Sequence, residues 1–122
     1  MVTHAGMNSA LECLSHGVPM VAIPITYDQP NIAQRIAWTG TGTMVPLETL
    51  TVDRLRDAVK EVLADPSYRT AALCLQQEIK QAHGLDRAAD LVERVISTGA
   101  PVLREWSTAS PLDRFSSTHS CE

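Results

Sequence analysis

The residues with the clearest potential for binding chemistry lie in one segment, T-H-A-G-M-N-S-A-L-E (residues 3–12). Here the end of a short strand, a glycine and a helix-capping residue follow one another, with Asn8 as the predicted N-cap of a helix over residues 9–16. A strand, loop and helix in this order leave backbone N–H groups free at the carboxyl end of a strand. Free N–H groups at the carboxyl end of a parallel strand favour the binding of a phosphate group.

A phosphate bound there would depend on the main chain for its charge balance. Arg35 is the only Lys or Arg among residues 1–50, so amide groups, the helix dipole and His4 would have to meet the negative charge. Gly6 permits close approach of the backbone, and the side chains of Asn8 and Ser9 can add hydrogen bonds. The same pattern also fits an ordinary capped helix after a glycine turn, so from the residues alone both interpretations stay open.

Three more polar side chains extend this candidate site. Glu12 follows Asn8 by one helical turn and shares its face, so its carboxylate can accept hydrogen bonds from the hydroxyls of a sugar. Asp28 and Gln29 follow the buried apolar run of residues 18–24 and can hold two sugar hydroxyls. The alternatives are a solvated acid at Glu12 and a plain turn before Pro30.

Motifs of several other chemistries are missing from the sequence. Ser9 does not stand in G-x-S-x-G, which argues against a hydrolase nucleophile. His4 and His16 lack the H-E-x-x-H spacing of zinc proteases, and the three cysteines, 61 and 47 residues apart, do not match a zinc knuckle.

Composition narrows the class of protein further. The 122 residues suffice for one domain, and 10 Lys+Arg against 14 Asp+Glu give a net charge of −4. With only 4% aromatic residues, this acidic chain is poorly suited to nucleic acid, so we expect no nucleic-acid partner. No apolar run approaches the ~20 residues of a transmembrane helix. The N-terminus shows no secretory signal, and we expect a cytoplasmic protein.

The predicted elements alternate in the first half of the chain and are helical thereafter. Strands are expected at residues 2–3, 18–24 and 43–45, with helices at 9–16 and 31–38 between them. Later helices begin after Thr51, at Pro66 and after Asp86, and Gly84 is expected to end the second of them. This order predicts an α/β fold, a partial Rossmann-like parallel sheet with flanking helices. Residues 1–97 form this partial domain, and residues 98–122 are expected to be a disordered Ser/Thr-rich tail.

Three segments together resemble a known family signature: residues 4–12 (H-A-G-M-N-S-A-L-E), 16–24 (H-G-V-P-M-V-A-I-P) and 28–29 (D-Q). They are similar to the nucleotide-sugar motif of the UDP-glycosyltransferases, the family 1 enzymes of the GT-B superfamily that includes plant, macrolide and carotenoid glycosyltransferases. T-Y-D-Q-P and I-A-W-T-G-T-G look most like bacterial carotenoid (zeaxanthin-type) members. The resemblance implies the C-terminal half of a GT-B nucleotide-sugar-binding domain.

The resemblance also implies a donor-binding site made of seven residues: His4, Gly6, Asn8, Ser9, Glu12, Asp28 and Gln29. The first four would bind the donor's diphosphate and Glu12 its ribose hydroxyls, while Asp28 and Gln29 would hold the transferred hexose. Met7 stands where plant members usually have Trp, so no packing role is carried over to it.

The activity implied is transfer of a hexose from a UDP-sugar, with UDP-glucose expected, to a hydroxyl of a small lipophilic acceptor. No cofactor and no metal are expected. In this family the general base and the acceptor pocket lie in an N-terminal domain that the chain lacks, so no catalytic residue is assigned. We expect a fragment that is inactive alone. The alternatives are a non-catalytic donor-binding subunit that works with a separately encoded N-terminal half, and a remnant without a ligand.

Overall fold

A computed structural model describes residues 1–103, so most of the predicted tail of residues 98–122 lies outside the described residues. The chain divides into two units, Met1–Ala82 and a second unit that begins at His83. The division of the chain at residue 97 stays a prediction. Within the described part of the chain, no helix has the length and apolar character needed to cross a membrane.

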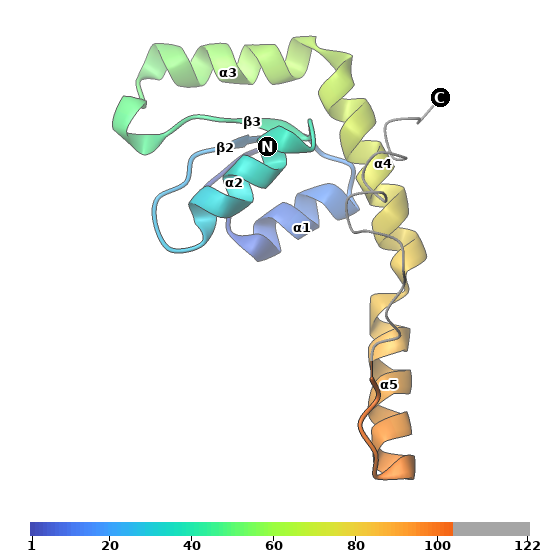
Figure 1. The fold of residues 1–122 in the computed structure, drawn as a ribbon. Helices are drawn as coiled ribbons and strands as arrows, with labels where there is room; N and C mark the ends of the chain where they lie inside the picture. The colour runs from blue at the N-terminus through green and yellow to red at the C-terminus, as the bar shows by residue number, and fades with distance from the viewer. Residues whose placement is uncertain (104–122) are drawn as a thin grey trace. The chain divides into compact units, whose positions relative to one another are not determined.

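The first unit is built on a three-stranded parallel sheet in the order β1-β2-β3 (Figure 1). The strands are β1 (Val2–Thr3), β2 (Met20–Ala22) and β3 (Gly42–Met44). Helix α1 (Met7–Ser15) connects β1 to β2, and α2 (Gln29–Trp38) connects β2 to β3. The α/β fold with a partial parallel sheet is therefore confirmed.

Helices cover both faces of this sheet. One apolar cluster joins α1 and α2 to it, and includes Ala10, Cys13, Met20 and Ile36. A second cluster joins Val21 and Val45 to the buried face of α3 (Val52–Ala64), on the opposite side of the sheet (Figure 1). A short 3₁₀ turn, η1 (Leu47–Thr49), leads from β3 towards α3. The sheet is thus the middle of three layers, and this explains why every residue of β2 is buried.

Helix α4 (Pro66–Ala82) packs beside α1. The side-chain amide of Gln76 donates to the carbonyl oxygen of Ser15 at 2.9 Å, which ties α4 to the last turn of α1. Gly17 follows that turn with φ +63°, and the N–H groups of Gly17 and Val18 donate to the carbonyls of Leu14 and Cys13. This is the C-terminal hydrogen-bond pattern that a glycine permits, so the predicted end of the helix is confirmed.

Three predicted helix boundaries are wrong. Helix α1 begins at Met7 after Gly6, so Asn8 lies inside the first turn and is not the N-cap. Helix α2 begins at Gln29 after Asp28, two residues before the predicted start at Asn31. Pro30 fits in the first turn because the N–H groups there have no partner within the helix, so a missing N–H costs no hydrogen bond.

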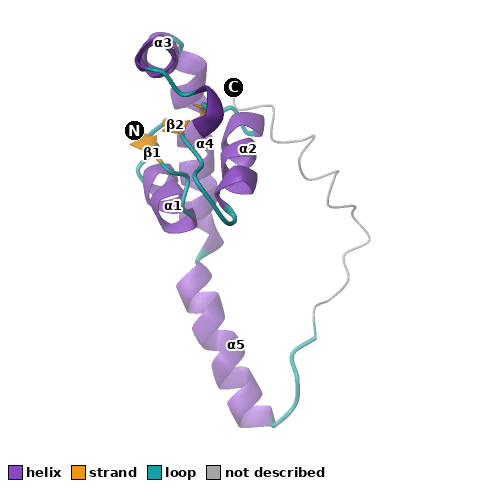
Figure 2. Ribbon diagram, turned by 90° about the vertical axis from the view of Figure 1, so that its left-hand side faces the viewer, coloured by secondary structure: helices purple, strands orange, loops and turns teal. Residues whose placement is uncertain are grey.

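The third wrong boundary concerns α5 (Gly84–Thr98), which belongs to the second unit. Gly84 opens this helix, and Asp86 lies within its first turn instead of capping it. The left-handed residue before the helix is His83 (φ 45°), so a histidine takes the conformation for which glycine was expected. Figure 2 shows α5 as one continuous helix.

We predict that Gly42→Ala destabilises the first unit by at least about 2 kcal/mol. A methyl group at this position would collide with the carbonyl oxygen of Met20 on the paired strand and would lie 2.8 Å from Cγ2 of Ile36. Urea unfolding followed by circular dichroism measures the change. Gly84→Ala is the matched control, because no atom of the described residues lies within 4 Å of the added methyl group, and the stability of this variant should not fall.

The second prediction tests that Thr51 caps helix α3 and that Asn8 does not cap helix α1. The Thr51 hydroxyl accepts a hydrogen bond from the N–H of Arg54 at 3.2 Å, so Thr51→Ala should cost about 1 kcal/mol of unfolding free energy. Asn8→Ala should change it by less than about 0.5 kcal/mol, because no cap bond is lost. Equal losses for the two variants in urea unfolding would contradict this assignment.

The third prediction concerns alkaline pH. Tyr68 donates to Glu61 at 2.6 Å, and this hydrogen bond raises the pKa of the phenol from 10.0 to about 12. Folding favours the neutral phenol, so its stabilising contribution is complete below pH 10.0 and is lost as the pH rises towards 12. The difference between the tyrosinate absorbance titrations of the wild type and Tyr68→Phe gives this pKa. Glu61→Gln should move it back towards 10.0.

Candidate functional site

The loop between β1 and α1 holds the first candidate residues, His4 to Gly6. Ala5, between them, has a left-handed backbone (φ 62°) and a completely buried side chain. Its N–H donates to the hydroxyl of buried Thr3 at 3.3 Å, which fixes the turn at the end of the strand. His4 and the first turn of α1 remain at the surface. The loop is therefore anchored from beneath and open to solvent above.

The first turn of α1 carries unsatisfied hydrogen-bond donors. Gly6 occupies the N-cap position and has no side chain with which to cap the helix. The first helical bond runs from the N–H of Ala10 to the carbonyl of Gly6 at 2.9 Å. For the three preceding N–H groups, of residues 7–9, the described part of the chain provides no acceptor. These amides and the positive end of the helix dipole form the strongest anion-attracting feature of the loop.

His4 lies directly over Gly6. A Cβ atom added to Gly6 would collide with Nε2 of the His4 imidazole, so glycine is the residue that leaves room for this ring. The ring lies beside the start of α1, where it can donate a hydrogen bond to an anion on the free amides. Of the predicted phosphate-binding residues, His4, Gly6, Asn8 and Ser9 all fall on this one loop and the helix turn that follows it.

Glu12 is exposed on α1, one turn beyond Asn8, as its spacing predicts. The neighbouring side chains of Ser15 and His16 bind the backbone carbonyl of Glu12, at 2.8 and 2.9 Å. No bond to its carboxylate is formed by any described residue, so both oxygens can accept hydrogen bonds from a ligand.

Asp28 and Gln29 sit at the start of α2 and differ in what they offer. Asp28 is the exposed N-cap residue, and its side chain makes no capping bond. The side-chain oxygen of Gln29 instead accepts from the N–H groups of Ile25 and Thr26, at 2.9 and 3.0 Å. Asp28 can therefore accept hydrogen bonds from a ligand, whereas Gln29 has only its NH₂ group to offer.

The sheet brings the two loops to one edge. Strands β1 and β2 are neighbours and run parallel, so the loops that follow them leave from the same end of the sheet. Helices α1 and α2 contact each other and both begin on the left side of the sheet in Figure 1. Six of the seven predicted residues thus lie on two adjacent loops and the helix starts that follow them, and Glu12 lies one turn further along α1.

Cationic and nucleophilic groups add little at this edge. The guanidinium of Arg35 stacks on the ring of Trp38, 5.6 Å from its centroid, in the last turn of α2 and away from the helix start. Burial is the main cause that raises the pKa of the Cys13 thiol, which contacts the sulfur of Met1 at 3.3 Å beneath α1. The described residues contain no cluster of three or more metal-ligating side chains. The site is therefore suited to binding an anion through main-chain donors.

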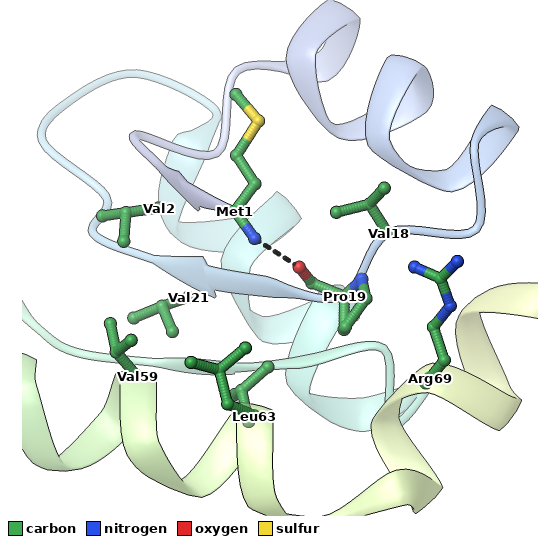
Figure 3. A pocket seen from close by; sticks show the side chains of 9 residues that line it. Met1, Val2, Val18, Pro19, Val21, Val59, Leu63 and Arg69 are labelled. Atoms are coloured by element: carbon green, nitrogen blue, oxygen red, sulfur yellow. Dashed lines mark hydrogen bonds between the residues drawn. The ribbon is translucent and has the colours of Figure 1, made fainter.

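A pocket of about 340 Å³ lies at the opposite, amino ends of β1 and β2 (Figure 3). Apolar side chains such as Val21, Val59 and Leu63 form its walls, with Arg69 from α4. The terminal amino group of Met1 donates to the carbonyl of Pro19 at its rim, at 2.6 Å. The lining holds neither an acid nor a nucleophile, so this pocket is distinct from the candidate site.

Three features of the site were missed in the sequence. Ala5 and Tyr27 both adopt left-handed backbones, although neither is a glycine, and no sequence signal indicates this. The third is that the oxygen of Gln29 is already hydrogen-bonded within its own loop. The sequence offers one local cue to this contact: Gln29 follows Ile25 by four residues and Thr26 by three, within reach of a glutamine side chain.

Comparisons with known proteins identify the family of the chain. The family described as UDP-glucoronosyl and UDP-glucosyl transferase matches residues 1–117. Mouse UDP-glucuronosyltransferase 3A1 is 41% identical over 90% of the chain and 22% of its own length. Zeaxanthin glucosyltransferase of Pantoea ananas is 33% identical over 91% of the chain and 26% of its own. The solved structure of a calicheamicin glycosyltransferase superposes with a TM-score of 0.73 and 31% identity, covering 82% of the chain and 26% of that protein.

The chain spans about a quarter of the length of the curated relatives it matches. The part it matches contains the parallel sheet, both loops at its carboxyl edge and the helices that follow. Family match, sequence identity and fold all agree, and the chain belongs to the UDP-glycosyltransferase family, with the GT-B type of fold.

Proposed function

We propose that the chain forms the donor-binding part of a glycosyltransferase. The reaction is transfer of a hexose from a UDP-sugar, with UDP-glucose as the expected donor, to a hydroxyl of a small lipophilic acceptor. The observation that carries the proposal is the set of three N–H groups at the start of α1, beside the His4 ring, for which residues 1–103 provide no acceptor. A diphosphate is the part of the donor that such a group of donors would bind.

The same donors would act in the chemical step. An acceptor oxygen attacks the anomeric carbon, a base takes the hydroxyl proton, and the bond from that carbon to the diphosphate oxygen breaks. The electron pair of the broken bond leaves with the nucleoside diphosphate. Amides and a helix dipole already aimed at the diphosphate stabilise this developing charge without rearrangement. In this proposal neither a metal ion nor a cofactor takes part.

The remaining residues would orient the donor. Glu12 has a free carboxylate on the same helix as the amides, and it would accept hydrogen bonds from the ribose hydroxyls. Asp28, on the neighbouring loop, would accept from hydroxyls of the hexose, and the NH₂ group of Gln29 would donate to them. Holding the sugar at several points fixes the anomeric carbon relative to the leaving group.

We place the general base and the acceptor-binding surface in the part of the relatives' length that lies outside this match. Leaving-group stabilisation alone removes only part of a barrier of many kcal/mol. The 122-residue chain by itself should therefore show no turnover of UDP-glucose with a hydroxylated acceptor. A separately supplied N-terminal half that restored turnover would support the two-chain arrangement.

The fourth prediction tests the amides directly. In an NMR titration of the chain with UDP, the backbone amide signals of residues 7–9 should shift. Met7→Pro removes one N–H donor at the first helical position, where proline is tolerated and the preceding Gly6 (ψ 141°) already has a compatible backbone. Loss of a hydrogen bond to a charged group should weaken UDP binding by about tenfold or more.

Met7→Ala is the matched control for this experiment. It shortens the same half-exposed side chain but keeps the N–H group, so its UDP affinity should match the wild type. Equal affinities for Met7→Pro and Met7→Ala, or no shift at residues 7–9, would contradict the proposed function.

A further inference from the structure

We propose that Gln29 is a positioning residue, which acts through its side-chain oxygen on the loop of residues 25–28. This inference rests on the proposed function for the identity of the ligand, whereas the effect on the loop can be measured without one. It assigns the two functional groups of one side chain to different tasks. The oxygen holds the loop, and the NH₂ group is left to donate to a ligand.

The hydrogen bonds at the start of α2 support the first task. The oxygen of Gln29 accepts from the N–H groups of Ile25 and Thr26, at 2.9 and 3.0 Å. The backbone N–H of Gln29 donates to the carbonyl of Thr26 at 3.3 Å. The first residue of the helix is therefore tied to the loop through both its main chain and its side chain. Two bonds use both lone pairs of the amide oxygen, so a ligand has no free acceptor there.

Tyr27 shows why the loop needs such a tie. Its backbone is left-handed (φ 57°), a conformation that is strained for a large side chain. The Tyr27 side chain is 90% exposed, so packing cannot offset this strain. The hydrogen bonds of Gln29 close the loop around this residue, from Ile25 and Thr26 on one side to the helix start on the other. We infer that they hold the strained conformation.

The loop held by Gln29 sets the position of Asp28. This residue directly follows Tyr27 and forms the N-cap of α2, with an exposed side chain that makes no capping bond. The direction of its carboxylate therefore depends on the path of the loop. Because the oxygen of Gln29 is already hydrogen-bonded within the loop, Asp28 and Gln29 together offer a ligand one acceptor, the Asp28 carboxylate, and one donor, the Gln29 NH₂ group. This arrangement suits the hydroxyls of a sugar, each of which can both donate and accept.

The fifth prediction is read from amide hydrogen exchange of the 122-residue chain. In Gln29→Ala and Gln29→Asn, the amides of Ile25 and Thr26 should exchange about five- to tenfold faster, because the oxygen is removed or can no longer reach them. Gln29→Glu keeps an oxygen at the same reach and should retain wild-type exchange. Gln34→Ala, at an exposed glutamine of the same helix, is the matched control and should have no effect.

Unchanged exchange in Gln29→Ala, or equally fast exchange in Gln29→Ala and Gln29→Glu, would overturn the proposal. Amide signals of β2 that match the wild type show that each variant is folded, since this strand is buried in the middle of the sheet.

Ligand titrations separate positioning from a purely structural role. If the loop orients Asp28 towards the sugar, Gln29→Ala should bind UDP-glucose more weakly than Gln29→Glu, which loses the same NH₂ group but keeps the oxygen on the loop. Equal UDP-glucose affinities of these two variants would contradict the positioning role. The affinity for UDP should stay within about twofold of the wild type in both, because the amides of α1 are untouched. An unchanged preference for UDP-glucose, despite faster exchange, would overturn the positioning role. A wild-type chain that bound neither nucleotide would contradict the proposed function, and the exchange data would then decide alone whether Gln29 holds the loop.

Discussion

Parallel pairing of β1 with β2 is the constraint on which the rest of the structure depends. A parallel neighbour can be reached only by a crossover, so the chain must leave each strand at one edge of the sheet and return from the other. Helices α1 and α2 provide these crossovers, and each begins just beyond the carboxyl end of a strand. Free amides and polar side chains collect at one edge for this reason. Gly42 makes the parallel pairing of β3 with β2 possible, because any side chain at this position would collide with the carbonyl of Met20.

In the proposed function, recognition of the charged donor would depend on dipoles instead of formal charges. The chain carries a net charge of −4, and the one arginine among its first fifty residues stacks on Trp38 at the far end of α2. Main-chain donors have fixed directions and lose no side-chain entropy on binding, so they select for geometry as well as for charge. The surrounding negative charge would disfavour loosely placed anions. The proposed donor carries a diphosphate and two sugar rings, so its affinity would depend mainly on how well its shape fits these donors.

Local signals predicted much of this architecture. Gly17 and Thr51 were correctly placed because a helix end and a helix cap depend on a few consecutive residues. Asn8 was wrongly placed as a cap, because asparagine is a preferred N-cap residue, yet the helix begins one residue earlier and Gly6, two positions before Asn8, is the cap. The left-handed backbones of Ala5 and Tyr27 could not be predicted. Neither residue is a glycine, so residue type gives no sign of these conformations.

The contact between His4 and Gly6 links two positions of the loop. A ring at position 4 occupies the space that any side chain at position 6 would need, so the two sites share one volume. Substitutions at the two positions should therefore be non-additive, because a methyl group at position 6 requires the imidazole to move, whereas it meets no ring when position 4 holds a small residue. In a library that randomises both positions, functional variants would pair a large residue at one site with glycine at the other. Such epistasis between positions 4 and 6 would reveal from sequence data alone that their side chains occupy the same space.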